Sequence, residues 1–430
     1  MLPKLKTFLV AALLGCLAGP MVVTAAFADT VVTMWTFLDP AKKSPREVAL
    51  KQLIDRFEAA NPGIRIKVEP QVFSELSVKF ILGHNTGNAP DTVFLNSESF
   101  GAVMGSGAAA DLQALFIKNW LKGEDEDFYI RAGWDAALVN GKRYAVPLFH
   151  ATDSIFIRKD LLAAAGLTLA DLKTWDSFTA AAQKLTKNNI WGFGTPLSTE
   201  KTGGTTALLT MIMGGQPDAW DRDKCEARYN TPTGRKTVQL HADWIARFRI
   251  MPKDTLVNNA DDLMDQFAAG RYAMVLGPYA RFTKAQQDAN WDKNQLAIIP
   301  FPNWTADRSG PQRVAGWWVA AWSKSPRLKE AGKWIEFLVS KEGVKVWSAV
   351  GGQIPTRTSE FNDPEYRKPE YDYMRTAVDA WREWSWILPV NCNTSRFDAD
   401  LNLAVARVAA GDKTPEQALI EAEKKFEERQ

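Results

Sequence analysis

The sequence predicts an α/β protein of two lobes, each built from a sheet flanked by helices. Three observations support this prediction. Strand-like and helix-like segments alternate along most of the chain, which is the pattern of α/β folds. About 400 residues follow an N-terminal export segment, and that length favours two lobes over one ordinary core. Residues 141–166 place two strand-like runs on either side of a polar break, which suits a chain passing between lobes beside a cleft.

The first 28 residues are predicted to be a secretory signal peptide. Lys4 and Lys6 give a basic start, an apolar run occupies 8–17, and Ala26-Phe27-Ala28 is a small-x-small cleavage site. Cleavage is therefore expected after Ala28. A membrane anchor is disfavoured because glycine and proline interrupt the apolar run. A lipoprotein-type cleavage box ending at Cys16 is an alternative.

Charge and cysteine content narrow the class of protein. The chain has 52 basic and 50 acidic residues, and removal of Lys4 and Lys6 leaves 50 of each. A net charge of zero gives no sign of nucleic-acid binding. No later segment is apolar enough to span a bilayer, so no stable membrane insertion is expected. Cys225 and Cys392 form either a disulfide, as exported proteins allow, or two separate buried thiols.

The elements before residue 100 follow from local signals. An apolar strand is expected at 31–35, and Ser44-Pro45-Arg46-Glu47 forms a capping box that starts a helix. Apolar residues at helical spacing continue that helix. Alternation predicts a strand at 64–68, and a further short strand is expected at 92–95.

The same alternation continues through the rest of the chain. Expected strands fall at 144–147, where Pro147 should stop the strand, and at 154–157, 272–276, 297–299 and 317–321. Expected helices fall at 160–165, 178–185, 263–267, 331–338, a stretch ended by Gly351-Gly352, and a last helix from 414.

Motifs for catalysis or cofactor binding are missing from the sequence. It contains no Walker loop, dinucleotide-binding glycine motif, serine-hydrolase elbow or zinc-protease helix. His84, His150 and His241 are far apart and lack metal-ligand spacing. No cofactor, metal site or catalytic residue is therefore predicted, although paired carboxylates remain an open route to an enzyme.

Candidate ligand residues follow the predicted strands, where ligands bind in open α/β sheets. Trp35 ends the first strand and Asp39 follows it, Asn96 and Glu98 follow the strand at 92–95, and Tyr279 follows 272–276. Aromatic faces pack against the C–H groups of sugars, and carboxylates accept hydrogen bonds from hydroxyls. The set indicates a cleft for a neutral sugar or polyol.

Each candidate also has a structural interpretation. Trp35 could be a core residue, Asp39 a turn acid, and Glu98 a residue that favours the start of the following helix. Trp317 and Trp318 are adjacent in a strand and therefore point to opposite faces. One of them is expected in the core, and the other is a ligand candidate.

The chain resembles the family 1 extracellular solute-binding proteins of ABC sugar importers, the group that includes maltose-binding protein. The resemblance rests on pieces that occur in the family's order: Met34-Trp35 with Asp39, 89–91, 141–166, 174–176, 267–279, 351–357 and 411–419. It implies a two-lobed periplasmic-binding-protein fold, hinged by about three crossing segments. The implied crossings lie near 148–154, 276–281 and 323–327, with lobe 1 at 29–148 and 282–325 and lobe 2 at 149–281 and 326–430.

The resemblance also implies a function. The expected protein is a periplasmic monomer without catalytic activity that binds carbohydrate and passes it to an ABC importer permease. Asp39 and Glu98 would hold sugar hydroxyls and Tyr279 would stack on the ligand. The remaining candidates are two cleft-wall residues and an arginine of a Gly-Gly-x-x-Pro-x-Arg motif: Phe149, His150 and Arg357.

Two alternative functions stay open from the sequence. A glycerol-phosphate-type ligand would need a basic cluster in the cleft. A secreted glycoside hydrolase would use Asp39 or Glu98 as one of two catalytic carboxyl groups. By the resemblance, Leu95 stands where some sugar-binding relatives have Trp, and Asp398 falls near another aromatic position of the maltose-binding group. Both departures make maltodextrin a less expected ligand.

Overall fold

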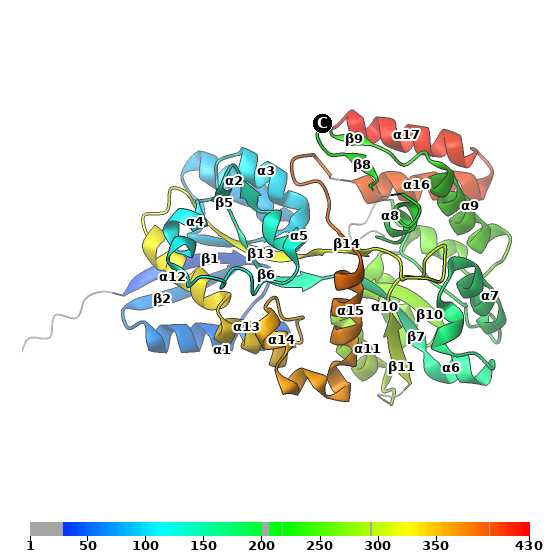
Figure 1. Ribbon diagram of the computed structural model, residues 1–430, viewed down its shortest axis with the longest axis horizontal. Coiled ribbons are helices and arrows are strands. Elements are labelled where there is room, and N and C mark those ends of the chain that lie inside the picture. The colour runs from blue at the N-terminus through cyan, green and yellow to red at the C-terminus, as the bar shows by residue number, and fades with distance from the viewer. Residues whose placement is uncertain (1–28, 200–205, 217, 293–294, 395) are drawn as a thin grey trace, which may run out of the picture.

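Two sheets, one in each half of the molecule, form the framework of the protein (Figure 1). This computed structural model describes residues 29–430 except 200–205, 217, 293–294 and 395. The predicted signal peptide, with Ala28 and Cys16, lies outside the described residues.

The first sheet has five strands in the order β2-β1-β3-β13-β6. Its strands are β1 (Thr30–Thr36), β2 (Ile64–Pro70), β3 (Thr92–Asn96), β6 (Val146–Ala151) and β13 (Ala315–Ala321). β1 pairs in parallel with β2 and β3, whereas β13 runs antiparallel to both β3 and β6. The carboxyl ends of β1, β2 and β3 therefore share one edge with the start of β13.

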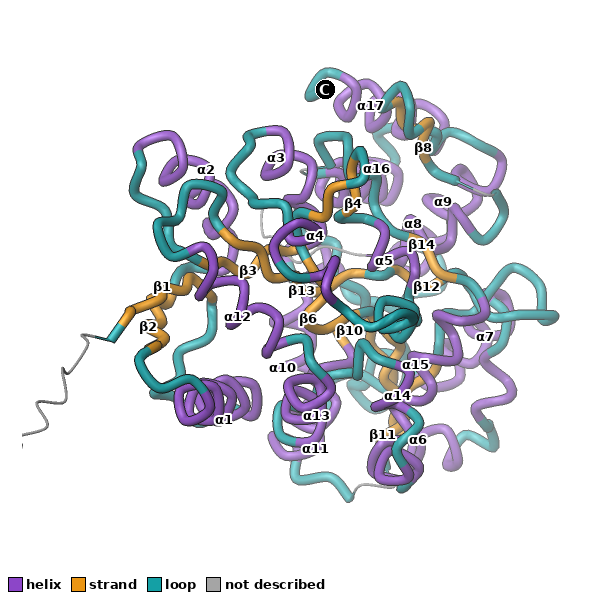
Figure 2. Tube along the Cα trace, turned by 60° about the vertical axis from the view of Figure 1, so that its left-hand side comes forward, coloured by secondary structure: helices purple, strands orange, loops and turns teal. Residues whose placement is uncertain are grey.

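Helices cover both faces of the first sheet, with α1 and α13 on one side and α2 and α3 on the other (Figure 2). The helices in this half are α1 (Pro45–Ala60), α2 (Leu76–Thr86), α3 (Phe100–Gly105), α4 (Leu112–Leu115), α5 (Arg131–Asp135), α12 (Leu328–Leu338) and α13 (Lys341–Ala349). The capping box at Ser44 and Glu47 is formed as predicted. Leu50 and Leu53 point into the core of this half, the first core.

The second sheet is antiparallel, with strand order β10-β7-β11. Its strands are β7 (Asp153–Arg158), β10 (Met274–Pro278) and β11 (Leu296–Ile299). The helices in this half are α6 (Lys159–Ala164), α7 (Trp175–Leu185), α8 (Thr206–Met213), α9 (Pro232–Ala246), α10 (Ala260–Ala268), α11 (Phe282–Ala289), α15 (Asp372–Glu383), α16 (Phe397–Ala410) and α17 (Pro415–Glu427). Trp175, Phe178 and Trp244 are buried in the core of this half, the second core.

In the described part of the chain, three short strand pairs and one short helix lie outside the two main sheets. They are the strand pairs β4 (Leu138–Val139) with β5 (Lys142–Arg143), β8 (Trp220–Asp221) with β9 (Glu226–Ala227), and β12 (Gln312–Arg313) with β14 (Ser385–Trp386), together with the helix α14 (Thr358–Phe361). Within the described ranges, no helix has both the length and the apolar character needed to cross a membrane.

The chain passes between the two sheets at three places. The first crossing joins β6 to β7 at Thr152, within the predicted range 148–154. The second enters β13 after β12, and the third follows α13, where Ile354 forms a bridge with His150. The crossings expected at 276–281 and 323–327 are not found there. After β10 the chain continues through α11 to β11, a strand of the same sheet, and after β13 it continues into α12, which packs in the first core.

The lobe boundaries expected from the sequence also differ from the structure, because two segments pack in the other lobe. Residues 282–299 were expected in lobe 1, but β11 pairs with β7. Residues 326–350 were expected in lobe 2, but α12 and α13 pack in the first core. We therefore propose that lobe 1 comprises 29–151 and 314–351 and that lobe 2 comprises 152–313 and 352–430.

The strand predicted at 144–147 begins at Val146, and it does not stop at Pro147 but runs on through His150 to Ala151. β6 is an edge strand, and an edge strand tolerates a residue that lacks an N–H group. A register shift in β13 between Trp317 and Trp318 lies opposite this position. The predicted polar break therefore shrinks to Thr152 alone.

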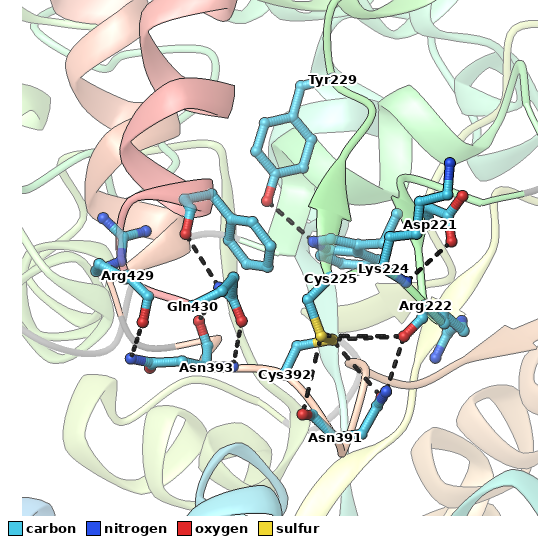
Figure 3. Close-up of a disulfide and its surroundings, with 12 residues drawn as sticks. Asp221, Arg222, Lys224, Cys225, Tyr229, Asn391, Cys392, Asn393, Arg429 and Gln430 are labelled. Atoms are coloured by element: carbon cyan, nitrogen blue, oxygen red, sulfur yellow. Dashed lines mark hydrogen bonds between the residues drawn. A yellow bond between two sulfur atoms is a disulfide. The ribbon is translucent and has the colours of Figure 1, made fainter.

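Cys225 and Cys392 form a disulfide, which resolves the two alternatives left open by the sequence. Their Cα atoms are 5.5 Å apart although 167 positions separate them in the chain. The bond joins the hairpin of β8 and β9 to the loop that follows β14 (Figure 3).

Candidate functional site

Three aromatic side chains gather at the edge of the first sheet where β1 and β2 end and β13 begins. We call Phe37, Phe73 and Trp317 the aromatic cluster. The ring centroid of Phe37 lies 4.3 Å from that of Trp317, and the ring of Phe73 meets Trp317 edge-on at 5.1 Å. Trp317 is 6% exposed and Phe73 is 48% exposed. The cluster therefore has a buried base and an open rim.

Arg46 places this cluster next to the second lobe. It lies in the first turn of α1, and its guanidinium carbon is 5.2 Å from the ring centroid of Phe37. Burial lowers the pKa of Arg46, and the charges of Arg281 and Asp261 in lobe 2 also act on it in opposite directions. Arg281 and Asp261 form an ion pair with each other. The start of α10, which carries Asp261, thus lies close enough to Arg46 for its charge to affect the pKa of that arginine.

Lobe 2 contributes a pocket of about 420 Å³ beside the start of α10. We call it the polar pocket, and its lining residues are Ser198, Thr199, Leu256, Val257, Asn258, Asp262, Asp265 and Gln266. The segment that precedes Ser198 runs parallel to β10, with Gly194 opposite Val275. Ser198 and Thr199 therefore lie toward the same edge as the residues that follow β10, as expected for a ligand site in an α/β fold.

Asn258 is the most informative side chain of the polar pocket. It is 7% exposed, and within the described part of the chain its Nδ2 atom has no hydrogen-bond partner. A buried donor without a partner destabilises the protein unless a ligand or water accepts its hydrogen bond. Asn259 begins α10 in a capping box with Asp262, which fixes the backbone at this position.

The chemistry of the two surfaces suits a polyhydroxylated ligand. Aromatic rings offer apolar faces, and the carboxylates of Asp262 and Asp265 and the amide of Asn258 offer acceptors and donors. In the described ranges, no group of three or more His, Cys, Asp or Glu side chains is placed to hold a metal ion.

Several residues predicted from strand ends lie at this edge of lobe 1. Asn96 is the register partner of Trp317, so these two candidates are neighbours. Trp35 packs against the first core and donates a hydrogen bond from Nε1 to Glu69 Oε2 at 2.9 Å. Asp39 accepts a hydrogen bond from the N–H of Ala41 at 3.0 Å, which is the geometry of a turn acid.

The position of Glu98 in the fold is partly described. Its backbone lies in the 3₁₀ turn Ser97–Ser99 between β3 and α3. Its side chain lies outside the described part of the structure, so its predicted contact with a ligand stays a prediction.

Four other candidates are buried near the crossings. Trp318 is fully buried and donates a hydrogen bond from Nε1 to Gly133 O at 3.0 Å, and Phe149 packs against Trp347. The ring of His150 packs edge-on against Trp318 and Trp381, and burial lowers the pKa of His150 to about 3. Tyr279 is fully buried, so no face of its ring is accessible in this arrangement.

Arg357 is fully buried and bonded within the protein. Its Nε donates to Val339 O at 2.7 Å, and its guanidinium lies 3.4 Å from carboxylate oxygens of Glu124 and Asp127. Burial lowers the pKa of Arg357, and the two carboxylates oppose that shift. The arginine thus joins the crossing after α13 to the first lobe.

The sequence predictions missed Phe37, Phe73, Arg46 and Asn258. Phe37 directly follows β1, so the rule of strand ends would have found it. Phe73 lies three residues after β2, and its meeting with Trp317 depends on the strand order. No local signal identifies Asn258, because its role depends on a pocket that several segments form.

Comparison with known proteins places these features in a family. The sequence profile of the family described as bacterial extracellular solute-binding protein matches residues 52–371. An arabinooligosaccharide-binding protein of Bacillus subtilis (strain 168) is 26% identical, with 81% of this chain and 79% of that protein covered. A maltodextrin-binding protein of the same organism is 23% identical over 75% of this chain and 73% of its own.

Solved structures share the fold. An ABC substrate-binding protein from Listeria monocytogenes in complex with cycloalternan has a TM-score of 0.77 and 21% identity, covering 93% of this chain and 98% of its own. Maltose-bound T. maritima MalE3 has a TM-score of 0.75 and 20% identity, covering 92% and 99%.

Proposed function

Because the chain belongs to the family of bacterial extracellular solute-binding proteins, we propose that it binds a neutral oligosaccharide between its lobes. The family consists of binding proteins rather than enzymes. The single observation that carries the proposal is the aromatic cluster of lobe 1, whose neighbour Arg46 lies within electrostatic range of Asp261 at the start of α10, the helix that lines the polar pocket of lobe 2. Stacking would come from Phe37, Phe73 and Trp317, and hydrogen bonds would come from the polar pocket.

The relatives named above support the ligand class, since two of them are named for arabino-oligosaccharide and maltodextrin binding. We propose that the protein acts as a monomer in the periplasm, is cleaved after Ala28, has no catalytic activity and delivers its ligand to an ABC importer permease. Asp39, Asn96 and Glu98 remain proposed ligand contacts, because they lie in the segments that follow β1 and β3.

A thermal-shift screen tests the ligand class. The panel contains arabino-oligosaccharides, maltodextrins, their monosaccharides and sugar alcohols. A ligand at 100 times its dissociation constant stabilises the folded state by about 2.7 kcal/mol, which gives a clear rise in melting temperature. No shift with any member of the panel would contradict the proposal.

The charges near the proposed site argue against a glycerol-phosphate-type ligand. Arg46 and Arg281 are basic, but Arg281 is paired with Asp261 and the polar pocket carries Asp262 and Asp265. A phosphodiester would meet repulsion from those carboxylates. The glycoside-hydrolase alternative predicts that the oligosaccharide is shortened. Mass spectrometry after a long incubation tests it, and recovery of the intact oligosaccharide would exclude it.

A further inference from the structure

One short loop of lobe 2 contacts both the first core and the second core. This loop, residues 387–394 between β14 and α16, carries Cys392, and we call it the disulfide loop. Leu388 and Cys392 belong to the second core. Ile387 and Val390 pack against the first core. Neighbouring side chains of the same loop are therefore divided between the two lobes.

The loop is fixed firmly to lobe 2. The disulfide joins Cys392 to Cys225, and Arg222 and Asn391 lie beside it (Figure 3). Arg222 forms two hydrogen bonds with the loop. Arg222 Nη2 donates to Ile387 O at 2.9 Å, and Asn391 Nδ2 donates to Arg222 O at 2.8 Å. One covalent bond and two hydrogen bonds thus limit the conformations of a segment that has no regular secondary structure beyond β14.

The opposite side of the loop meets lobe 1 at a glycine. A Cβ atom on Gly101 of α3 would overlap the carbonyl oxygen of Val390, so the two backbones approach as closely as only glycine allows. α3 begins directly after the turn Ser97–Ser99, which follows β3 and the proposed ligand contact Asn96. The loop therefore packs against the helix that begins next to the proposed site.

We propose that the disulfide loop is an interlobe latch: it favours the arrangement in which the two lobes are in contact at Gly101 and Val390, and it thereby strengthens ligand binding. When only a fraction of the molecules has the arrangement that binds ligand, the apparent dissociation constant equals the intrinsic dissociation constant divided by that fraction. A loop already ordered by its disulfide loses little conformational freedom when Val390 meets Gly101. The part of this inference that concerns affinity rests on the proposed function, whereas the part that concerns lobe arrangement does not.

Two kinds of variant distinguish loss of the contact between the disulfide loop and lobe 1 from a general loss of stability. Gly101→Ala puts a methyl group against the backbone of Val390 and should displace the loop. Gly105→Ala is the matched control, because it lies on the same helix and a Cβ there has nothing within 4 Å. The double variant Cys225→Ser/Cys392→Ser removes the covalent anchor, and Val390→Ala removes the side chain that packs on lobe 1 without touching the disulfide.

The first measurement is small-angle X-ray scattering of the ligand-free proteins, each checked by circular dichroism for folding. Gly101→Ala, Val390→Ala and the double cysteine variant should have a larger radius of gyration than the wild type, and Gly105→Ala should match it. Scattering curves that superimpose for all folded variants would overturn the latch, whatever ligand the protein binds.

The second measurement is calorimetric titration with arabinotriose and maltotriose. For whichever sugar the wild type binds, Gly101→Ala should weaken the affinity by about five-fold or more, the lower range of typical coupling between distant sites. Gly105→Ala should leave it unchanged. Equal affinities in Gly101→Ala and Gly105→Ala would overturn the link to binding. A wild type that binds neither sugar counts against the proposed ligand class, and the scattering comparison still decides the latch.

Discussion

The hydroxyl group of Tyr279 donates a hydrogen bond to the carbonyl oxygen of His150 at 3.1 Å. The same hydroxyl accepts a hydrogen bond from the N–H of Ile354 at 3.0 Å. His150 and Ile354 lie at two of the three crossings between the lobes and bridge each other. Tyr279 follows β10, so one buried phenol ties the second sheet to two crossings. This position gives the residue a role in the hinge that its place after a strand did not indicate.

Tyr279→Phe is expected to destabilise the protein by about 1–3 kcal/mol, because the buried N–H of Ile354 loses its acceptor. Urea denaturation measures the change. Tyr272→Phe is the control, since Tyr272 is also buried but its hydroxyl makes only a long hydrogen bond of 3.4 Å to Gln266. Equal losses in the two variants would refute a special role for Tyr279.

Phe73→Ala is expected to weaken oligosaccharide binding by about five-fold, in line with about 1 kcal/mol for an aromatic contact. Because Phe73 is 48% exposed, its removal should change the free energy of unfolding by less than about 0.5 kcal/mol. Leu82→Ala on α2 is the control, as its side chain is even more exposed. Titration calorimetry and thermal unfolding provide the two readouts. Unchanged affinity in Phe73→Ala removes this ring from the site.

Asn258→Ala should lower ligand affinity by about ten-fold, corresponding to loss of one hydrogen bond of about 1.4 kcal/mol. The reason is that the Nδ2 atom has no partner among the described residues and lies at the polar pocket. Asn303→Ala is the matched control. Asn303 is likewise buried with one side-chain atom lacking a hydrogen bond, but it does not line the pocket. If both variants bind equally well, Asn258 is not a ligand contact.

Stability should fall as the pH decreases below about 6.5, the ordinary pKa of histidine. Burial lowers the pKa of His150 to about 3 and that of His241 to about 4, so both rings are neutral in the folded protein. Between about pH 6 and pH 4.5 the unfolded chain binds protons that the folded chain does not, and acid therefore favours unfolding. Each histidine contributes a slope of about 1.4 kcal/mol per pH unit.

The variant His150→Gln tests whether His150 is neutral in the folded protein. Its unfolding free energy should decline less steeply than the wild type between pH 6 and pH 4.5, by about 1.4 kcal/mol per pH unit, even if its stability at pH 7 is lower. Guanidinium denaturation at a series of pH values provides the slopes. Identical slopes would mean that His150 is protonated in the folded protein at these pH values.

The local elements of this protein follow from its sequence. The capping box at Ser44, the alternation at 64–68 and the apolar spacing of α12 predicted elements that the structure contains, because each depends on residues a few positions apart. The α/β class and the two-lobed architecture also followed from the sequence, with help from the family resemblance. The export segment was identified in the same way and stays a prediction.

Other properties depended on contacts between distant segments. Strand spacing could not show that β11 pairs with β7, that Cys225 meets Cys392, or that Arg357 is buried against Glu124 and Asp127. The rule of strand ends pointed to the edge of the first sheet at which the aromatic cluster lies. It could not decide between Trp317, which joins Phe37 and Phe73, and Trp318, which is enclosed in the core.

The sequence by itself thus determined where strands and helices form and which family the chain resembles, because hydrophobic period, capping and turn residues act locally. Only the tertiary structure decided which strand ends stay accessible and which close into the hinge. The physical reason is that burial of a side chain such as Tyr279 or Asn258 depends on every segment packed around it, and those segments lie far apart in the chain.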